Sequence, residues 1–260
     1  MTKEKHILWE KKDCLSVLKV GIMNVSNIKH CAKRTILGLR REKVMAKLVL
    51  FQGDSITDCH RVKDDILSMG MGYALMAAGE LGGKYPGEYE FINKGISGNR
   101  ITDVYARIKR DIINLKPDYM SILIGVNDVW HEVDRDNGVS AEKFEIIYDM
   151  LIEEIIQALP HIKIMILEPF VLEGKKTTAT EIKPDRWEYF KNETPLRAAV
   201  AKRIAEKYGL TYVPLQEKFD AACEQMPTSY WLGDGVHPTP MGHWLIKEEW
   251  MKAFEEMRKE

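Results

Sequence analysis

Long hydrophobic runs are missing from this 260-residue sequence, and with them the usual signature of a membrane protein. No apolar stretch approaches the ~20 residues that a bilayer-spanning helix requires, so we expect no membrane association. Cysteines are few as well: Cys14, Cys31, Cys59 and Cys223 lie far apart and form no CxxC pair. This spacing indicates neither a disulfide framework nor a zinc site, and it favours reduced thiols in a cytoplasmic protein.

The chain also lacks an excess of charge of one sign. Its 38 basic and 39 acidic residues give a formal net charge of −1, which argues against a nucleic-acid partner. Hydrophobic residues make up 45% and charged residues 30%, an ordinary globular composition that excludes intrinsic disorder for most of the chain. The length predicts one large domain or two small ones.

The first 44 residues differ from the rest in charge. Eleven of the basic and four of the acidic residues lie there, a net of +7 that leaves −8 for residues 45–260. Lys and Asp interrupt every apolar stretch of this segment, so it does not resemble a secretory signal. Two interpretations stay open. Residues 1–44 form a basic extension, or Met45 is the true initiator; purine-rich codons for Arg40-Arg41-Glu42, resembling a ribosome-binding site, would support the second. A nucleic-acid-binding role for residues 1–44 is compatible only with the interpretation that they form a basic extension of the protein.

Residues 45–260 alternate short apolar runs with helical patterns. The runs predict five strands, at 47–51, 88–93, 119–124, 162–167 and 211–213. Between and after them we expect a helix capped by Ser140, one that begins at Thr194-Pro195 and ends at Gly209, and a last one containing Trp250. Strands that alternate with helices predict one α/β domain, a parallel sheet with helices on both faces.

Four polar segments follow predicted strands or lie near the end of the chain. They are GDS (53–55), KGISGN (94–99), GVND (125–128) and DGVHP (234–238). Ligands of such sheets bind outside the carboxyl ends of the strands, so these segments are the candidates for chemistry.

Together these segments contain the parts of a serine hydrolase. Ser55 offers a nucleophile, His237 a base that can activate it, and Asp234 a carboxylate to orient that base. The amides of Ser55 and Gly98 and the side chain of Asn127 could form the oxyanion hole. Taken singly, each is as readily a helix cap, a tight turn, an Asx-turn or a loop hydrogen bond. Their joint occurrence in loops favours catalysis.

These motifs resemble those of the SGNH hydrolases, the GDSL esterase/lipase superfamily, over essentially all of residues 45–260. The resemblance rests on GDSITD (53–58), NKGISGN (93–99), GVND (125–128) and DGVHP (234–238). It implies Ser55 as nucleophile, His237 as base, Asp234 as its partner, and the Ser55 amide, Gly98 and Asn127 as oxyanion hole. It further implies a flavodoxin-like three-layer α/β/α sandwich with a mainly parallel five-stranded sheet, and neither a metal nor an organic cofactor.

Residues 93–99 and 124–130 are most similar to small bacterial acetyl esterases that act on xylo-oligosaccharides. That resemblance implies an ester of a small molecule or an oligosaccharide as substrate, a cytoplasmic location and a homo-oligomeric assembly. One departure is Gly233, where those relatives often carry a Trp; here Trp231 lies two positions earlier.

Three further residues are candidates for substrate contact: Trp130, Arg61 and Trp231. Trp130 follows the oxyanion segment and could wall an acyl pocket, stack on a sugar or simply fill the core. Arg61 could contact substrate or form a structural ion pair. The polar segment 170–189 could overhang the site or be a surface excursion.

The sequence therefore favours a serine esterase that removes acetyl groups from a carbohydrate. A lysophospholipase or acyl-thioesterase would use the same triad, but no Leu-rich loop lies beside the motifs. A non-catalytic carbohydrate-binding protein is disfavoured because the four motif side chains, Ser55, Asn127, Asp234 and His237, are all present.

Overall fold

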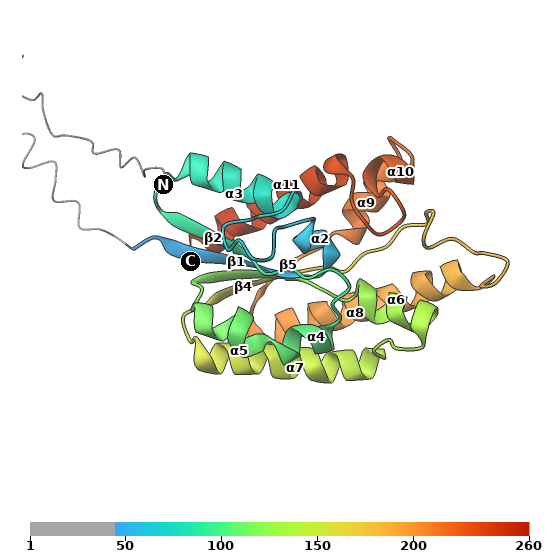
Figure 1. Cartoon of the computed structure of the whole chain (residues 1–260), viewed down its shortest axis with the longest axis horizontal. Coiled ribbons are helices and arrows are strands. Elements are labelled where there is room, and N and C mark those ends of the chain that lie inside the picture. The colour runs from blue at the N-terminus through green and yellow to red at the C-terminus, as the bar shows by residue number, and fades with distance from the viewer. Residues whose placement is uncertain (1–44, 260) are drawn as a thin grey trace, which may run out of the picture. The chain divides into compact units, whose positions relative to one another are not determined.

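A parallel sheet of five strands forms the centre of residues 45–259, the part of the chain that this computed structural model describes (Figure 1). The strand order is β2-β1-β3-β4-β5, and every neighbouring pair is parallel. The strands are β1 (Lys47–Gly53), β2 (Tyr89–Asn93), β3 (Tyr119–Leu123), β4 (Lys163–Leu167) and β5 (Thr211–Val213). The predicted α/β fold is thus confirmed, whereas the expectations for residues 1–44 lie outside the described residues.

Helices cover both faces of the sheet and complete three layers (Figure 1). One face carries α3 (Tyr73–Lys84), α9 (Gln216–Cys223), α10 (Thr228–Trp231) and α11 (Pro240–Met257). The other carries α4 (Ile101–Ala106), α5 (Ile108–Asp111), the 3-10 helix η1 (Ile113–Leu115), α7 (Ala141–Ala158) and α8 (Arg186–Tyr208). Two more helices follow strands directly, α2 (Ser55–Asp58) after β1 and α6 (Val126–Arg135) after β3.

The period-two geometry of the strands divides the apolar side chains between two cores. Val49 and Phe51 of β1 belong to the core under α3 and α11, and Leu50 belongs to the core under α4 and α7. Trp250 of α11 stacks on Phe51 with ring centroids 5.0 Å apart, so the last helix of the chain is held against the first strand. No helix within residues 45–259 is long and apolar enough to cross a membrane.

The sequence predicts three helices in this part of the chain. Two of them, α7 and α11, lie where they are predicted, and the predicted start of the third, α8, is wrong. Ser140 caps α7 by accepting a hydrogen bond from the Lys143 amide. Thr194-Pro195, in contrast, does not open a helix, because α8 already begins at Arg186 and Pro195 lies inside it. Burial of earlier residues such as Phe190 holds the first turns in place, and tertiary packing thereby outweighs the local start signal. Gly209 ends α8 in the left-handed conformation, as expected.

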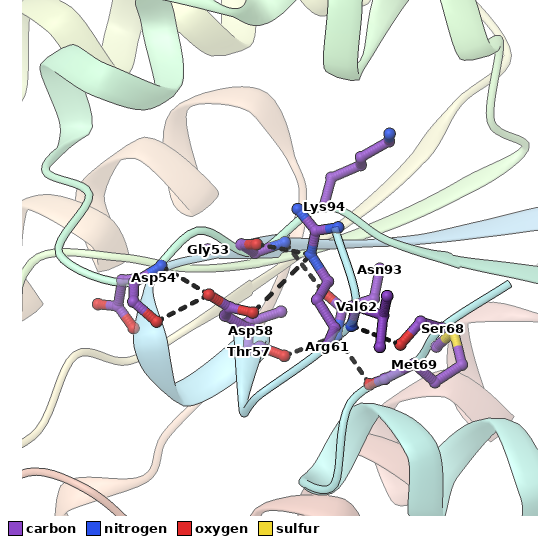
Figure 2. A network of polar contacts seen from close by, with 12 residues as sticks. Gly53, Asp54, Thr57, Asp58, Arg61, Val62, Ser68, Met69, Asn93 and Lys94 are labelled. Carbon is purple, nitrogen blue, oxygen red and sulfur yellow. Dashed lines mark hydrogen bonds and ion pairs between the residues drawn. The ribbon is translucent and has the colours of Figure 1, made fainter. Parts of the chain in front are cut away.

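The register of the sheet brings three loops together at its carboxyl edge. Phe51 of β1 pairs with Asn93 of β2, and Gly53 of β1 pairs with Leu123 of β3. The buried Asn93 amide then ties two of the loops, donating to Thr57 O at 2.6 Å and to Met69 O at 2.9 Å (Figure 2). The segments that follow β1, β2 and β3 are therefore neighbours, as the motif analysis requires.

Candidate active site

Ser55 is placed by a tight passage from β1 into α2. Gly53 has a φ of 155°, and a Cβ there would lie 2.4 Å from Leu123 O, so only glycine fits this passage. Asp54 caps α2 by accepting a hydrogen bond from the Ile56 amide at 2.9 Å. Ser55 is therefore the first residue of the helix rather than its cap, and its side chain is free to face the loop that carries His237.

The second part of the site is the turn from Asp234 to His237. One carboxylate oxygen of Asp234, Oδ1, accepts hydrogen bonds from the amides of Val236 at 3.0 Å and His237 at 2.8 Å. The other oxygen, Oδ2, lies 2.8 Å from His237 Nδ1. Gly235 between them has a φ of 100°, a conformation that disfavours any side chain. The short turn thus fixes the carboxylate against one edge of the imidazole.

The opposite edge of the imidazole faces the serine. His237 Nε2 lies 2.9 Å from Ser55 Oγ, across 182 residues of sequence. The three side chains form a continuous chain of hydrogen bonds from carboxylate to hydroxyl. The His237 side chain is 43% exposed, so a ligand can reach it.

The electrostatics of the turn suit a histidine that accepts a proton. Partial burial alone would raise the pKa of Asp234, but hydrogen bonds from the His237 ring and from the turn amides lower it to about 2. The hydrogen bond to Asp234 in turn raises the pKa of His237, and burial opposes that effect only in part. Nearby, burial raises the pKa of Asp54 to about 6.

Three candidate oxyanion donors surround Ser55. Within the described part of the chain, the amides of Ser55 and Gly98 donate to no protein acceptor, and Gly98 has a φ of 82°. Asn127 Nδ2 donates one hydrogen to Asn99 O at 3.2 Å, which orients the amide and leaves its second hydrogen free. Next to it, the buried carboxylate of Asp128 accepts from the Ile101 amide at 3.1 Å and joins the same two loops.

Two cavities border the Ser55–His237 pair. The first, which we call the Arg61 cavity, has a volume of about 570 Å³. The second, the Trp130 cavity, has a volume of about 290 Å³. The Arg61 cavity is lined by Ser55, Ile56, Asp58, Cys59, His60, Arg61, Lys63, Ser97, His237, Pro238 and His243. The Trp130 cavity is lined by Ser55, Ser97, Gly98, Asn127, Trp130, His131, Asp134, Arg135 and His237.

Trp130 bounds its cavity in a fixed orientation. Its indole Nε1 donates to Asp134 Oδ2 at 2.7 Å, and its ring centroid lies 5.6 Å from that of His237. The ring also meets Phe190 edge-on at 5.9 Å. Trp130 is thus both part of the packing and part of the cavity wall.

A brace that the sequence analysis missed supports the triad turn from behind. The Leu172 amide donates to Gly235 O at 2.9 Å, and the Lys176 amide donates to Asp234 O at 2.8 Å. Arg186 donates to Lys176 O at 2.6 Å and pairs with Asp134, the residue that holds Trp130. Part of the segment 170–189 therefore buttresses the site. A Cβ on Gly235 would lie 2.6 Å from Leu172 O, so glycine is required where this segment packs against the turn, but glycine in a loop is too common to predict the contact.

The remaining two candidates for substrate contact differ in position. Arg61 lines the larger cavity, and its Nε lies 3.9 Å from Asp58 Oδ1. The ion pair is therefore present, and substrate contact stays a prediction. Trp231 lines neither cavity. It is 9% exposed and donates from Nε1 to Ala222 O at 3.0 Å, so the structure places it in the core and not where the predicted substrate contact would need it. In residues 45–259 no group of three or more His, Cys, Asp or Glu side chains could hold a metal ion.

Comparison with known proteins identifies the family. The model of the GDSL-like lipase/acylhydrolase family matches residues 51–245, a span that includes Ser55, Gly98, Asn127 and His237. The chain belongs to this family. It is a carboxylic ester hydrolase with the α/β fold of the GDSL hydrolases.

Individual GDSL relatives support the same conclusion. The chain is 31% identical over 214 residues to an acetylxylan esterase of Geobacillus stearothermophilus, covering 78% of this chain and 92% of the relative. A solved structure of that esterase, a catalytic mutant, covers 81% of this chain and 95% of its own, with a TM-score of 0.69. A protein from Parabacteroides merdae described as a GDSL-like lipase has 34% identity and a TM-score of 0.74, with coverage of 81% and 97%.

Proposed function

We propose that the protein hydrolyses acetyl esters of a carbohydrate, such as an acetylated xylo-oligosaccharide, through an acyl-enzyme at Ser55. The observation that carries this proposal is the aligned chain Ser55 Oγ, His237 Nε2, His237 Nδ1 and Asp234 Oδ2, with 2.9 Å and 2.8 Å between the bonded atoms. These distances lie within the reach that a nucleophile, its base and the group that orients the base require.

In the first half of the reaction, Ser55 Oγ attacks the ester carbonyl carbon while its proton moves to His237 Nε2. Asp234 stabilises the imidazolium that forms. The carbonyl oxygen becomes an oxyanion, which accepts hydrogen bonds from the Ser55 and Gly98 amides and from Asn127 Nδ2. The intermediate collapses, and the alcohol leaves with the proton from His237.

In the second half, a water molecule attacks the acetyl group on Ser55. His237 accepts a proton from this water and returns it to Ser55 Oγ when the bond to the acetyl carbon breaks. Acetate leaves, and the enzyme regains its starting state. The Trp130 cavity contains Gly98 and Asn127, so we place the acetyl group there and the alcohol part in the Arg61 cavity.

The relatives support an acetylated sugar as substrate. Solved structures of the Geobacillus protein describe it as an acetylxylan esterase and an acetyl-xylooligosaccharide esterase, and its catalytic mutants replace one aspartate or one serine by alanine. The triad of this chain contains one residue of each type.

We also propose that the protein forms a homo-oligomer in the cytoplasm. Analytical ultracentrifugation that shows a monomer at micromolar concentration would refute the assembly.

The test compares the wild type with Ser55→Ala on acetylated xylo-oligosaccharides and follows acetate release. Serine-dependent release supports the proposal. Turnover of a simple aryl acetate without release from the sugar would keep the triad and discard xylan as substrate. Serine-dependent turnover of acyl-thioesters or lysophospholipids alone would favour those classes instead, and equal activity of both proteins would refute the role of Ser55.

A further inference from the structure

The Arg61 cavity is positively charged beside the nucleophile. We propose that Arg61 and Lys63 bind a carboxylate on the alcohol part of the substrate, so that the preferred ester is an acetylated sugar acid or an oligosaccharide bearing one. This inference rests on the proposed function, because it assigns a substrate class to the same site.

Arg61 lines this cavity, and a hydrogen bond from its inner nitrogen fixes the guanidinium group. The residue is 9% exposed, and its Nε donates to Gly95 O at 2.8 Å. In the part of the chain that the structure describes, its two terminal nitrogens donate to no protein group, yet neither is sealed from solvent. Four N–H donors of a fixed planar fork are therefore available, and this geometry matches a carboxylate.

Asp58 does not occupy that fork. Its Oδ2 accepts from the Ser97 amide at 2.9 Å and from Ser97 Oγ at 2.7 Å. Its Oδ1 faces the inner nitrogen of Arg61, Nε, at 3.9 Å (Figure 2). Asp58 thus balances one positive charge and anchors Arg61 from the side, while the terminal nitrogens stay free.

Lys63 adds a second positive charge to the same cavity. It is exposed, and among residues 45–259 it forms no ion pair. Asp64 and Asp65 follow it in sequence but do not line the cavity, so Asp58 is the single acidic residue there against Arg61 and Lys63. The net charge favours an anion over a neutral sugar.

The experiment uses two esters that differ in one group: monoacetylated methyl glucoside and monoacetylated methyl glucuronoside, acetylated at the same hydroxyl. We expect the full-length wild type to show a kcat/KM about tenfold higher for the glucuronoside at low salt, as a charged hydrogen bond predicts. This ratio should fall as sodium chloride is added. Lys63→Gln should lower the ratio several-fold, and Arg61→Gln should remove it.

Lys109→Gln is the matched control, because it removes one exposed lysine from α5 and lines neither cavity at Ser55. It should leave the ratio unchanged. If Arg61→Gln fails to fold, the ratio measured for Lys63→Gln and the salt dependence of the wild-type ratio still test the inference. Equal kcat/KM for the two esters in the wild type would overturn the inference while leaving the proposed function intact.

Calorimetric binding separates the inference from the proposed function. Methyl glucuronoside should bind to the wild type more tightly than methyl glucoside, and Lys63→Gln should reduce the difference. If neither ester released acetate, the proposed sugar substrate would fail, and this binding measurement would still decide whether the cavity selects a carboxylate. Equal binding of the two glycosides would overturn the inference.

Discussion

Replacing Asp234 by asparagine should inactivate the enzyme by reversing the tautomer of His237. The wild-type Oδ1 accepts two backbone hydrogen bonds, at 3.0 Å and 2.8 Å. An asparagine will keep its own oxygen in that position, because the opposite orientation would set its NH₂ group against two N–H donors. Leaving those donors unpaired would cost about 1–3 kcal/mol each.

In the favoured orientation the NH₂ group of the introduced asparagine faces His237 Nδ1, 2.8 Å away in the wild-type geometry. Nδ1 must then accept a hydrogen bond, so the ring proton moves to Nε2. An Nε2–H group facing Ser55 Oγ cannot remove the serine proton. We expect kcat to fall on the order of 10⁴-fold, which corresponds to about 5.4 kcal/mol of barrier.

The assay is acetate release from an aryl acetate, together with nitrogen NMR of the His237 ring to read the tautomer. Asp220→Asn is the matched control, since Asp220 is exposed on α9, accepts a hydrogen bond from Gln216 and lines neither cavity at Ser55. It should retain wild-type kcat. An Asp234→Asn variant that keeps more than a tenth of the activity, or that still carries its proton on Nδ1, would contradict this role of Asp234.

Further predictions concern the other groups of the site. Asn127→Ala should lower kcat by about 10²–10³; an unchanged kcat would remove Asn127 from the oxyanion hole. Ser55→Ala and His237→Ala combined should cost about as much as either alone, and additive losses in the double variant would contradict a concerted pair. Because the pKa of His237 is raised above 6.5 and its neutral form is the base, kcat/KM should fall as the pH drops through a value above 6.5; a limb below 6.5 in a pH-rate profile would contradict this. Trp130→Ala should raise kcat/KM for butyrate relative to acetate esters about tenfold or more, and an unchanged acyl preference would show that Trp130 does not bound the acyl site.

Much of the fold follows from local patterns in the sequence. The buried strands are apolar over short stretches bounded by turn residues, as at Lys47–Gly53, and a buried parallel sheet needs this composition. The start of α8 was missed because Pro195 resembles a first helical residue, whereas the packing of Phe190 in the core extends the helix by more than two turns before it. Local signals do not contain that contact.

The candidate site also has residues that the sequence predicts and contacts that it does not. Ser55, Asn127 and the turn from Asp234 to His237 lie at or next to loops, and their joint occurrence in order along the chain predicts them as candidates. The brace formed by Lys176 and Arg186 involves backbone carbonyls and residues distant in sequence, so no residue spacing predicts it. Trp231 and Trp130 look equally suited to a cavity wall until their neighbours in space are known.

The proposed mechanism requires that Ser55 becomes acetylated during turnover. The most direct measurement mixes the wild type with excess aryl acetate, quenches within the first turnovers, and locates the added mass by peptide mass spectrometry. Ser55→Ala serves as the second sample, because it lacks the hydroxyl that would form the ester and should carry no adduct. We expect one acetyl group on the peptide containing Ser55. Turnover without any adduct, or an adduct on another residue, would contradict it.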